Sequence, residues 1–159
     1  PGVGAMGACV DGIRAAGFDQ ALAEYVKNRP MLGVCVGMQV LFESGDESGG
    51  VDGLSWFHGQ VNHFDPAITQ QGLKIPHMGW NQVAHQGHPL FDGIPSDERF
   101  YFVHSYRVAE SAEAIAHSDH GGAFVAAVGR DNVVATQFHP EKSQHAGLQL
   151  YANFLKWMP

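Results

Sequence analysis

Two periods of hydrophobic residues run along the chain, one typical of helices and one typical of strands. A glycine-rich loop at residues 1–4 precedes a helical pattern of small residues that ends at Gly17. In residues 18–28 the apolar side chains recur at i, i+4, i+7 and i+8, which predicts an amphipathic helix with Asp19 as its N-cap. The first part of the chain is therefore predicted to form a loop and two helices.

A short apolar run follows at residues 31–36, with the sequence MLGVCV. Its length and composition suit a strand of a parallel sheet that is buried on both faces. Residues 37–45 resume a helical spacing, which ends at Gly45. This part of the chain predicts a strand, a sharp turn and a helix.

The pattern then changes to the period of strands. Between Gly49 and His85, short alternating segments separated by Gly, Pro and Asp predict small or edge strands. Residues 99–108 are rich in aromatic and β-branched side chains and predict a strong strand. Residues 123–139 predict a hairpin that turns at residues 129–132.

Residues 143–158 return to helical spacing at the end of the sequence. Leu148, Tyr151, Leu155 and Met158 recur along one face, which we expect to pack on the sheet. The predicted fold is α/β, a mixed sheet flanked by helices, in one domain that spans residues 1–159.

Composition and charge narrow the class of function. Hydrophobic residues make up 45% of the chain and charged residues 16%, as in compact globular proteins. A net charge of −7 with only nine Lys and Arg argues against a nucleic-acid partner. No apolar run is long enough for a spanning helix, so no membrane partner is expected. Two cysteines make no disulfide scaffold, which favours the reducing cytoplasm.

Cys35 is the candidate nucleophile. It lies in the segment Gly33-x-Cys35-x-Gly37, at the junction of the predicted strand and helix. This spacing is typical of a nucleophile elbow, a strained turn that holds a reactive side chain clear of the sheet. The N-terminus of the following helix is expected to favour thiolate over thiol. The alternative is a small buried hydrophobic residue, which is our interpretation of Cys9.

A basic partner for this thiol is expected, because a thiol with a pKa of about 8.5 is mostly protonated at neutral pH. His139 ends the predicted hairpin and is followed by Pro140 and Glu141. An extended His-Pro-Glu places both side chains on one side of the chain, so Glu141 can orient the imidazole as in a triad. The alternatives are a solvated helix start at Pro140 and another base, such as His104.

Other kinds of site find less support in the sequence. The pairs His85-x-x-His88 and His117-x-x-His120 resemble metal-ligand spacings, but neither has a third ligand nearby, so no metal is expected. The glycine-rich start lacks the preceding strand and the later acidic residue of a dinucleotide fingerprint. No nucleotide or other cofactor is therefore predicted.

Four segments together resemble a known family: GVCVGMQVLFE, KIPHMGWN, FYFVHSY and TQFHPEKSQ. They are similar to the glutamine amidotransferase subunit of imidazole glycerol phosphate synthase, within the class I, triad-type amidotransferases. The elbow and the His-Pro-Glu are shared across the class, whereas PHMGWN and FVHSY indicate the histidine-biosynthesis branch. The resemblance covers the whole chain. It implies a glutaminase that splits glutamine to glutamate and ammonia and passes the ammonia to a cyclase subunit in a heterodimer.

The resemblance also implies roles for individual residues. Cys35 would form a γ-glutamyl thioester, His139 would act as base and then as acid, and Glu141 would orient His139. Glu47 would bind the α-ammonium group of glutamine. The implied positions are, in full, Val36, Val3 and Gly4 for the oxyanion, Gln39, Glu47, Ser105 and Tyr106 for the glutamine pocket, and His77, Met78, Trp80 and Lys142 for the partner interface.

Family members begin with a β-α-β portion ahead of the loop found here at residues 1–4, so the resemblance implies an N-terminally incomplete chain. We expect the sheet to lack strands beside the elbow, and the chain alone to be poorly soluble and nearly inactive. Two other functions stay open. One is the glutaminase of another class I amidotransferase, and the other is a silent binding subunit whose triad does not assemble.

Overall fold

The computed structural model describes residues 1–159 and contains two sheets. The strands are β1 (Met31–Val34), β2 (Phe42–Gly45), β3 (Val51–Asp52), β4 (Phe57–His63), β5 (His77–His85), β6 (Glu98–His104), β7 (Tyr106–Val108), β8 (Ala114–Asp119), β9 (Ala123–Arg130) and β10 (Val133–Thr136). The larger sheet has the order β1-β10-β9-β8-β5-β6 and the smaller one β3-β2-β4-β7. Parallel pairs, β1 with β10 and β2 with β4, occur beside antiparallel ones, so the fold is mixed α/β as expected.

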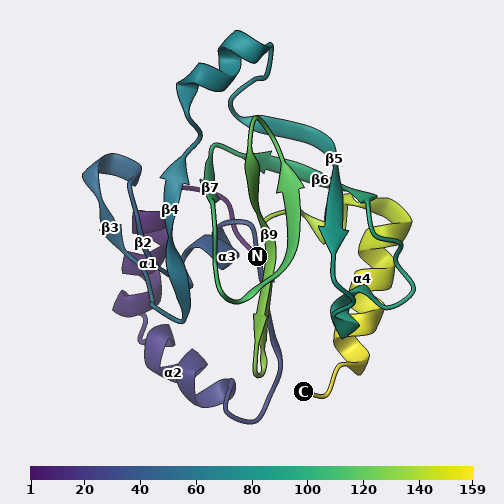
Figure 1. Ribbon diagram of the computed structural model, residues 1–159. Helices are drawn as coiled ribbons and strands as arrows, with labels where there is room; N and C mark the ends of the chain where they lie inside the picture. Colours follow the sequence, from purple (N-terminus) through teal and green to yellow (C-terminus); the bar gives the residue numbers. More distant parts are fainter.

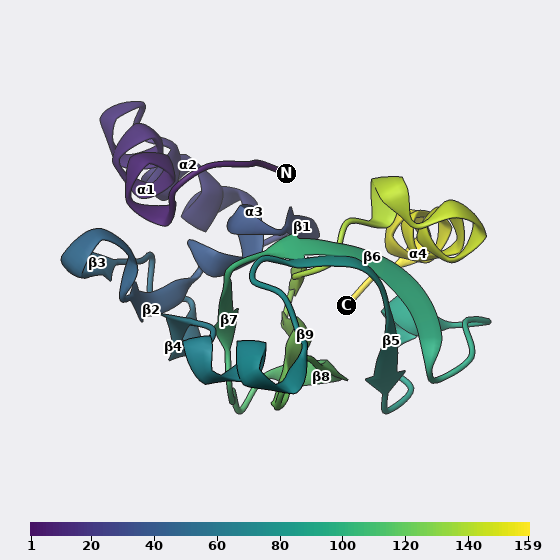
Figure 2. The same cartoon turned by 90° about the horizontal axis from the view of Figure 1, so that it is seen from above.

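Helices lie on either side of this framework. They are α1 (Met6–Ala15), α2 (Phe18–Tyr25), α3 (Val36–Gln39) and α4 (Gln144–Lys156), with short 3₁₀ segments η1 (Glu47–Gly49), η2 (Pro66–Gln71), η3 (Pro89–Phe91) and η4 (Pro140–Lys142). Figure 1 shows α1 and α2, in purple, beside the small sheet, and α4, in yellow, beside β5 and β6. The view from above in Figure 2 places the same helices on opposite sides of the molecule. None of the helices combines the length and the apolar character that a membrane span requires.

Both faces of the larger sheet are buried where β10 lies. Val133 and Ala135 contact one hydrophobic cluster, which also contains Met38 and Phe42. Val134, between them, contacts a second cluster that is rich in phenylalanine. Successive side chains of a strand point to opposite faces, so a strand with two buried faces needs a continuous apolar run. This explains the uninterrupted VVAT of β10 and the apolar MLGV of β1.

Several of the predicted elements are confirmed. The first helix ends at Ala15, beside Gly17, and β1 is a parallel strand. The hairpin of β9 and β10 turns at Asp131 and Asn132. The strand expected over residues 99–108 is broken at Ser105, and its two parts, β6 and β7, belong to different sheets.

The helix predicted over residues 37–45 is wrong for its second half. Helix α3 ends at Gln39, and residues 42–45 form β2, which pairs with β3 and β4. Phe42 is fully buried between these elements. A short apolar segment fits either period, and tertiary pairing decided between them.

Two expectations about the helices, the packing face of α4 and the N-cap of α2, are also wrong. Leu148, Leu155 and Met158 are 66%, 83% and 93% exposed, while Leu150 and Gly147 are the buried residues of α4. The apolar residues of α4 occupy more than one face, so their spacing did not reveal which face packs. In α2 the N-cap is Gly17, with a φ of 69°, and not Asp19.

Gly147 permits a close approach between α4 and the segment that precedes it. A Cβ built at this position would lie 1.8 Å from the carbonyl oxygen of Pro140. No side chain fits there without movement of backbone, and Pro140 is the residue between His139 and Glu141.

We therefore expect Gly147→Ala to lower the free energy of unfolding by about 1–3 kcal/mol, the usual cost of forcing an extra group into a packed site. Gly12→Ala is the matched control, because Gly12 also lies inside a helix but has open space around it. That substitution should raise stability by about 0.5–1 kcal/mol. Urea unfolding of both variants checks this, and a loss for Gly12→Ala equal to that for Gly147→Ala would contradict it.

Candidate active site

The parallel pairing of β1 with β10 brings the predicted nucleophile and base to the same edge of the sheet. Val34 pairs with Thr136, and the Cys35 N–H donates to the Thr136 carbonyl at 2.8 Å. Cys35 follows β1 directly, and His139 lies three residues beyond the end of β10. Two residues far apart in sequence thus leave neighbouring strands in the same direction.

Cys35 has the backbone conformation of a nucleophile elbow. Its φ of 55° and ψ of −113° lie in a region that residues other than glycine rarely adopt. A Cβ at Gly33 would lie 2.6 Å from the Gly37 carbonyl oxygen, so the turn closes only because Gly33 has no side chain. The close approach to Gly37 therefore explains why a glycine stands two residues before Cys35.

Burial controls the ionisation of the thiol. Cys35 is 8% exposed, and burial raises the pKa of its thiol above the ordinary value, with the charge of Glu141 adding to this effect. The Val36 N–H, the Gln137 amide and the Lys142 charge lower the pKa, but burial is the largest contribution. The Val36 N–H at the start of α3 thus acts in the expected direction, toward the thiolate, but burial outweighs it. Helix α3 has only four residues, so its dipole is small.

His139 is held by both its side chain and its backbone. Its Nδ1–H donates to Glu141 Oε1 at 2.6 Å, while its Nε2 is buried and has no hydrogen-bond partner. The His139 N–H donates to the Tyr101 carbonyl at 2.8 Å. The Ser143 hydroxyl donates to the His139 carbonyl at 2.6 Å and accepts from the Tyr101 N–H at 3.0 Å.

These contacts give the imidazole a fixed tautomer and a free Nε2. An unsatisfied buried nitrogen is uncommon in a folded protein and marks a place where a further partner is expected. Pro140 also starts the 3₁₀ segment η4, so the helix start proposed as an alternative exists, and it coexists with the contact between His139 and Glu141.

A cavity of about 330 Å³ opens beside Cys35. It gathers all of the residues predicted for the oxyanion and for glutamine, together with three that the sequence did not single out for this pocket. Its lining residues are Val3, Gly4, Cys35, Val36, Gln39, Glu47, Pro76, Val103, His104, Ser105 and Tyr106. His139 and Glu141 are not among them, and the side chain of His139 is buried.

Glu47 has a structural contact in addition to its place in the cavity. Its Oε2 accepts the Met6 N–H at 2.6 Å, at the first residue of α1. One carboxylate oxygen therefore satisfies a helix N-terminus, and the other has no contact of this kind.

The residues predicted for the partner interface divide into two groups. Met78 and Trp80 are 62% and 42% exposed, and Lys142 is exposed with its Nζ 5.8 Å from the ring of Tyr101. His77 is only 4% exposed, so its side chain is not available at the surface as expected. Strand β5 alternates, and His77 points inward where Met78 points outward.

The inward-pointing His77 belongs to a chain of hydrogen bonds with a fixed direction. The Tyr106 carbonyl accepts from His104 Nδ1 at 2.8 Å, so His104 Nε2 carries no proton and accepts from His77 Nδ1 at 2.9 Å. His77 Nε2 then accepts from Asn81 Nδ2 at 3.1 Å. This arrangement requires both imidazoles to be neutral. No local spacing signals it, because His77 and His104 lie far apart in sequence and meet only through the pairing of β5 with β6.

In each pair of histidines with metal-ligand spacing, at least one ring already has a backbone partner. The ring nitrogens of His85 and His120 lie 3.0 Å and 2.8 Å from the carbonyls of Ile94 and Lys74. The structure contains no group of three or more side chains placed to hold a metal ion.

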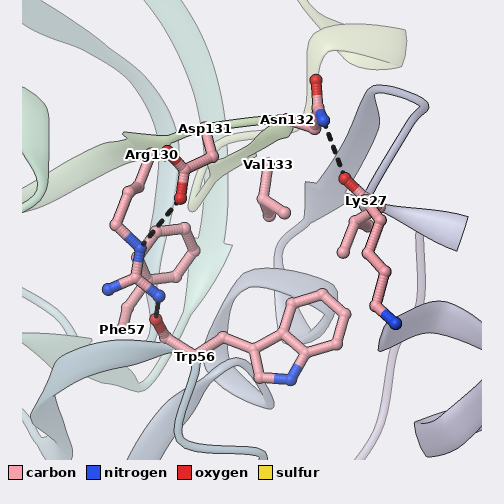
Figure 3. Close-up of a pocket in the computed structure, with 8 residues that line it drawn as sticks. Lys27, Trp56, Phe57, Arg130, Asp131, Asn132 and Val133 are labelled. Atoms are coloured by element: carbon pink, nitrogen blue, oxygen red, sulfur yellow. Dashed lines mark hydrogen bonds and ion pairs between the residues drawn. The ribbon is translucent and has the colours of Figure 1, made fainter. Parts of the chain in front are cut away.

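A second cavity, of about 370 Å³, lies at the other end of β1. Figure 3 shows Trp56 and Phe57 at its wall, with the Arg130 guanidinium against the Phe57 ring. Arg130 also donates to the Trp56 carbonyl, and Asn132 donates to the Val26 carbonyl at 2.8 Å. These polar groups are occupied, and no cysteine or histidine lines this cavity.

Comparison with known proteins identifies the family. Residues 1–157 match the model of the family described as glutamine amidotransferase class-I. The chain belongs to the class-I glutamine amidotransferase family. Two solved structures, both of glutamine amidotransferases, share its fold. One has a TM-score of 0.67 at 16% identity, covering 96% of this chain and 74% of that one. The other, from Thermotoga maritima, has a TM-score of 0.58 at 16% identity, covering 98% and 60%.

Closer relatives of this amidotransferase chain share about half of its residues. A protein of Neisseria meningitidis serogroup A is 52% identical over 99% of the chain and 76% of its own length. One of Acinetobacter baylyi is 51% identical over 99% of the chain and 77% of its own length. Both are named imidazole glycerol phosphate synthase subunit HisH. The chain thus spans about three quarters of the length of these relatives.

Because His77 and His104 are hydrogen-bonded in their neutral forms, we predict that the stability of the fold depends on pH. Burial, and then the charge of His120, lowers the pKa of His77 to about 4, and burial is the main cause that lowers the pKa of His104 to about 3. In an unfolded chain both groups titrate near pH 6.5. Between these pKa values the unfolded state therefore binds more protons than the folded state. The stability that the neutral histidines contribute is fully present above about pH 6.5 and is lost as the pH falls toward 4.

We expect the free energy of unfolding to fall by up to about 1.4 kcal/mol per pH unit for each of the two histidines below pH 6. Urea unfolding at pH 7.5 and pH 5 measures this. His77→Gln should reduce the dependence, whereas His145→Gln, at an exposed position, should leave it unchanged. Equal stability at the two pH values would contradict the prediction.

Proposed function

We propose that the chain is the glutaminase part of an imidazole glycerol phosphate synthase. The observation that carries this proposal is the placement of Cys35. It lies at a strained elbow directly after β1, and β1 pairs with β10, the strand that leads to the His139–Glu141 pair. The names of the relatives support the same synthase. The reaction would convert glutamine and water to glutamate and ammonia.

In the first step, Cys35 gives its proton to His139 Nε2 as the sulfur attacks the amide carbon of glutamine. The free Nε2 is suited to accept this proton, because Nδ1 is committed to Glu141. The raised pKa of the Cys35 thiol makes such a base necessary at neutral pH. His104 cannot replace His139 in this role, since both of its ring nitrogens are already occupied.

The negative oxygen formed by this attack needs hydrogen-bond donors. The Val36 N–H is one candidate, at the first residue of α3. The loop at residues 1–4 supplies the second, because Gly2 pairs with Cys35 as an isolated parallel bridge and both Val3 and Gly4 line the cavity. Gly4 has a φ of 122°, which allows the loop to present its N–H groups without strain.

Collapse of this intermediate breaks the carbon–nitrogen bond. His139 returns its proton to the leaving nitrogen, so that ammonia departs and a γ-glutamyl thioester remains on Cys35. A water molecule then attacks the thioester with His139 again acting as base. The products are glutamate and the regenerated thiol, and atoms and charges balance over the cycle.

The remaining cavity residues would hold the amino-acid end of glutamine. The second carboxylate oxygen of Glu47 is the proposed partner of the α-ammonium group, with Ser105 and Tyr106 beside it. A cavity of about 330 Å³ is of the size that encloses a small amino acid. Two free cysteines fit the cytoplasm as the proposed location, where thiols are kept reduced.

Ammonia would pass from this site to a cyclase subunit. The proposed docking face contains Met78 and Trp80 on β5 together with Lys142, near the His139–Glu141 segment. Exposed Met and Trp side chains are typical of the centres of protein interfaces. This face places the partner beside the triad and away from α2.

Cys35→Ala should abolish glutamine hydrolysis, measured as glutamate release in the presence of a cyclase subunit of this synthase, while the unfolding midpoint stays within a few degrees. Cys9→Ala is the control, because Cys9 packs at the edge of a core cluster and away from the cavity. It should keep nearly full activity. Hydrolysis that survives Cys35→Ala would reject Cys35 as the nucleophile.

Trp80→Ala should weaken binding of the cyclase subunit by at least tenfold, since truncation of a central interface Trp costs about 2 kcal/mol or more. Titration calorimetry with that subunit measures the change in Kd. Phe18→Ala, at a 58% exposed position on α2, should bind as tightly as the unchanged chain. Equal losses from both substitutions would show that the effect is not local to the proposed face.

A further inference from the structure

Gln137 is a buried polar residue that the mechanism above does not use. It lies between the end of β10 and His139, and its side chain is fully buried. Its Nε2 lies 3.8 Å from Cys35 Sγ, within hydrogen-bond range for sulfur. Its Oε1 accepts from Gln39 Nε2 at 3.0 Å. The amide of Gln137 therefore joins the nucleophile to Gln39.

The orientation of this amide follows from a group whose role is fixed. The Tyr106 carbonyl can only accept, so the Gln39 atom 3.2 Å away from it must be the amide nitrogen. The same nitrogen donates its second hydrogen to Gln137, which must therefore present its oxygen. The nitrogen of Gln137 is left facing Cys35 Sγ. The Tyr106 carbonyl thus fixes the orientation of the Gln39 amide, and through it the orientation of the Gln137 amide, whose nitrogen faces the sulfur.

We propose that Gln137 is a further catalytic residue, whose amide N–H stabilises the Cys35 thiolate, and that Gln39 is the positioning residue that fixes this amide. This inference rests on the proposed glutaminase function and gives Gln39 a role beyond lining the cavity. The amide donates a hydrogen bond and keeps its proton, so it complements His139 as the base and does not replace it.

The chemistry of the thiolate explains why such a donor is useful. A buried anion is costly unless it is hydrogen-bonded, and a bond to a charged acceptor is stronger than a bond to the neutral thiol. The sulfur gains negative charge as its proton passes to His139, and again as it leaves the thioester, and the donor acts at both moments. Because Gln137 is already oriented by Gln39, no rearrangement is needed when the charge appears.

The test measures alkylation of Cys35 by iodoacetamide as a function of pH, in chains that also carry Cys9→Ala. The rate at a given pH follows the thiolate fraction. Gln137→Met has nearly the same volume and no donor, and it should lower the rate at pH 7.5 by about tenfold or more, since hydrogen bonds to charged groups are worth that much. Gln39→Met should lower it less, because the Gln137 amide remains but is free to rotate.

Gln149→Met is the matched control, because Gln149 is exposed on α4 and should show an unchanged alkylation profile. A folded Gln137→Met chain with the native profile would overturn the proposal. Glutamine turnover plays no part in this measurement, so a failure of the proposed glutaminase function would leave its result intact. In the glutaminase assay, Gln137→Met should reduce kcat with little change in KM.

A measurement on the unchanged side chains covers the case in which Gln137→Met does not fold. The side-chain amide resonances of Gln137 should shift in NMR spectra when Cys35 is titrated to the thiolate, in the chain with Cys9→Ala. The resonances of Gln149 should stay in place. A Gln137 amide that does not respond to ionisation of Cys35 would overturn the proposal.

Discussion

The parallel pairing of β1 with β10 is the constraint on which the site depends. Its register places Val34 beside Thr136. The nucleophile and the residues that act on it lie within a few positions after these two residues. Cys35 turns at once into α3, while Gln137 and His139 continue from β10. The pairing is buried on both faces, so a change of register would expose apolar side chains and separate the nucleophile from its base.

The Tyr106 carbonyl links this site to the rest of the molecule. It accepts from Gln39, which orients the amide next to Cys35, and from His104, which begins the chain through His77 to Asn81. In both of these series of hydrogen bonds the groups are neutral, and each bond can have only one donor and one acceptor. Strand β5, which carries the exposed Met78 and Trp80, is therefore joined to the nucleophile by continuous hydrogen bonds.

Local patterns predicted the elbow, the hairpin and the His139–Glu141 contact, because each depends on residues close together in sequence. They failed at residues 42–45, where pairing with β4 overrides helical spacing, and on α4, where Gly147 and Leu150 are buried and Leu148 is exposed. Gln137 and the neutral histidines could not be found in this way. Their significance arises from contacts between residues far apart in sequence, for which no spacing rule exists.

The central claim is that the β1–β10 pairing brings Cys35 within reach of His139 to form a covalent intermediate. Acid quenching during turnover of glutamine with the cyclase subunit, followed by mass spectrometry of peptides, tests it most directly. We predict a γ-glutamyl adduct on the peptide that contains Cys35, and its loss in His139→Ala. An adduct that forms equally well without His139, or that lies on Cys9, would contradict the claim.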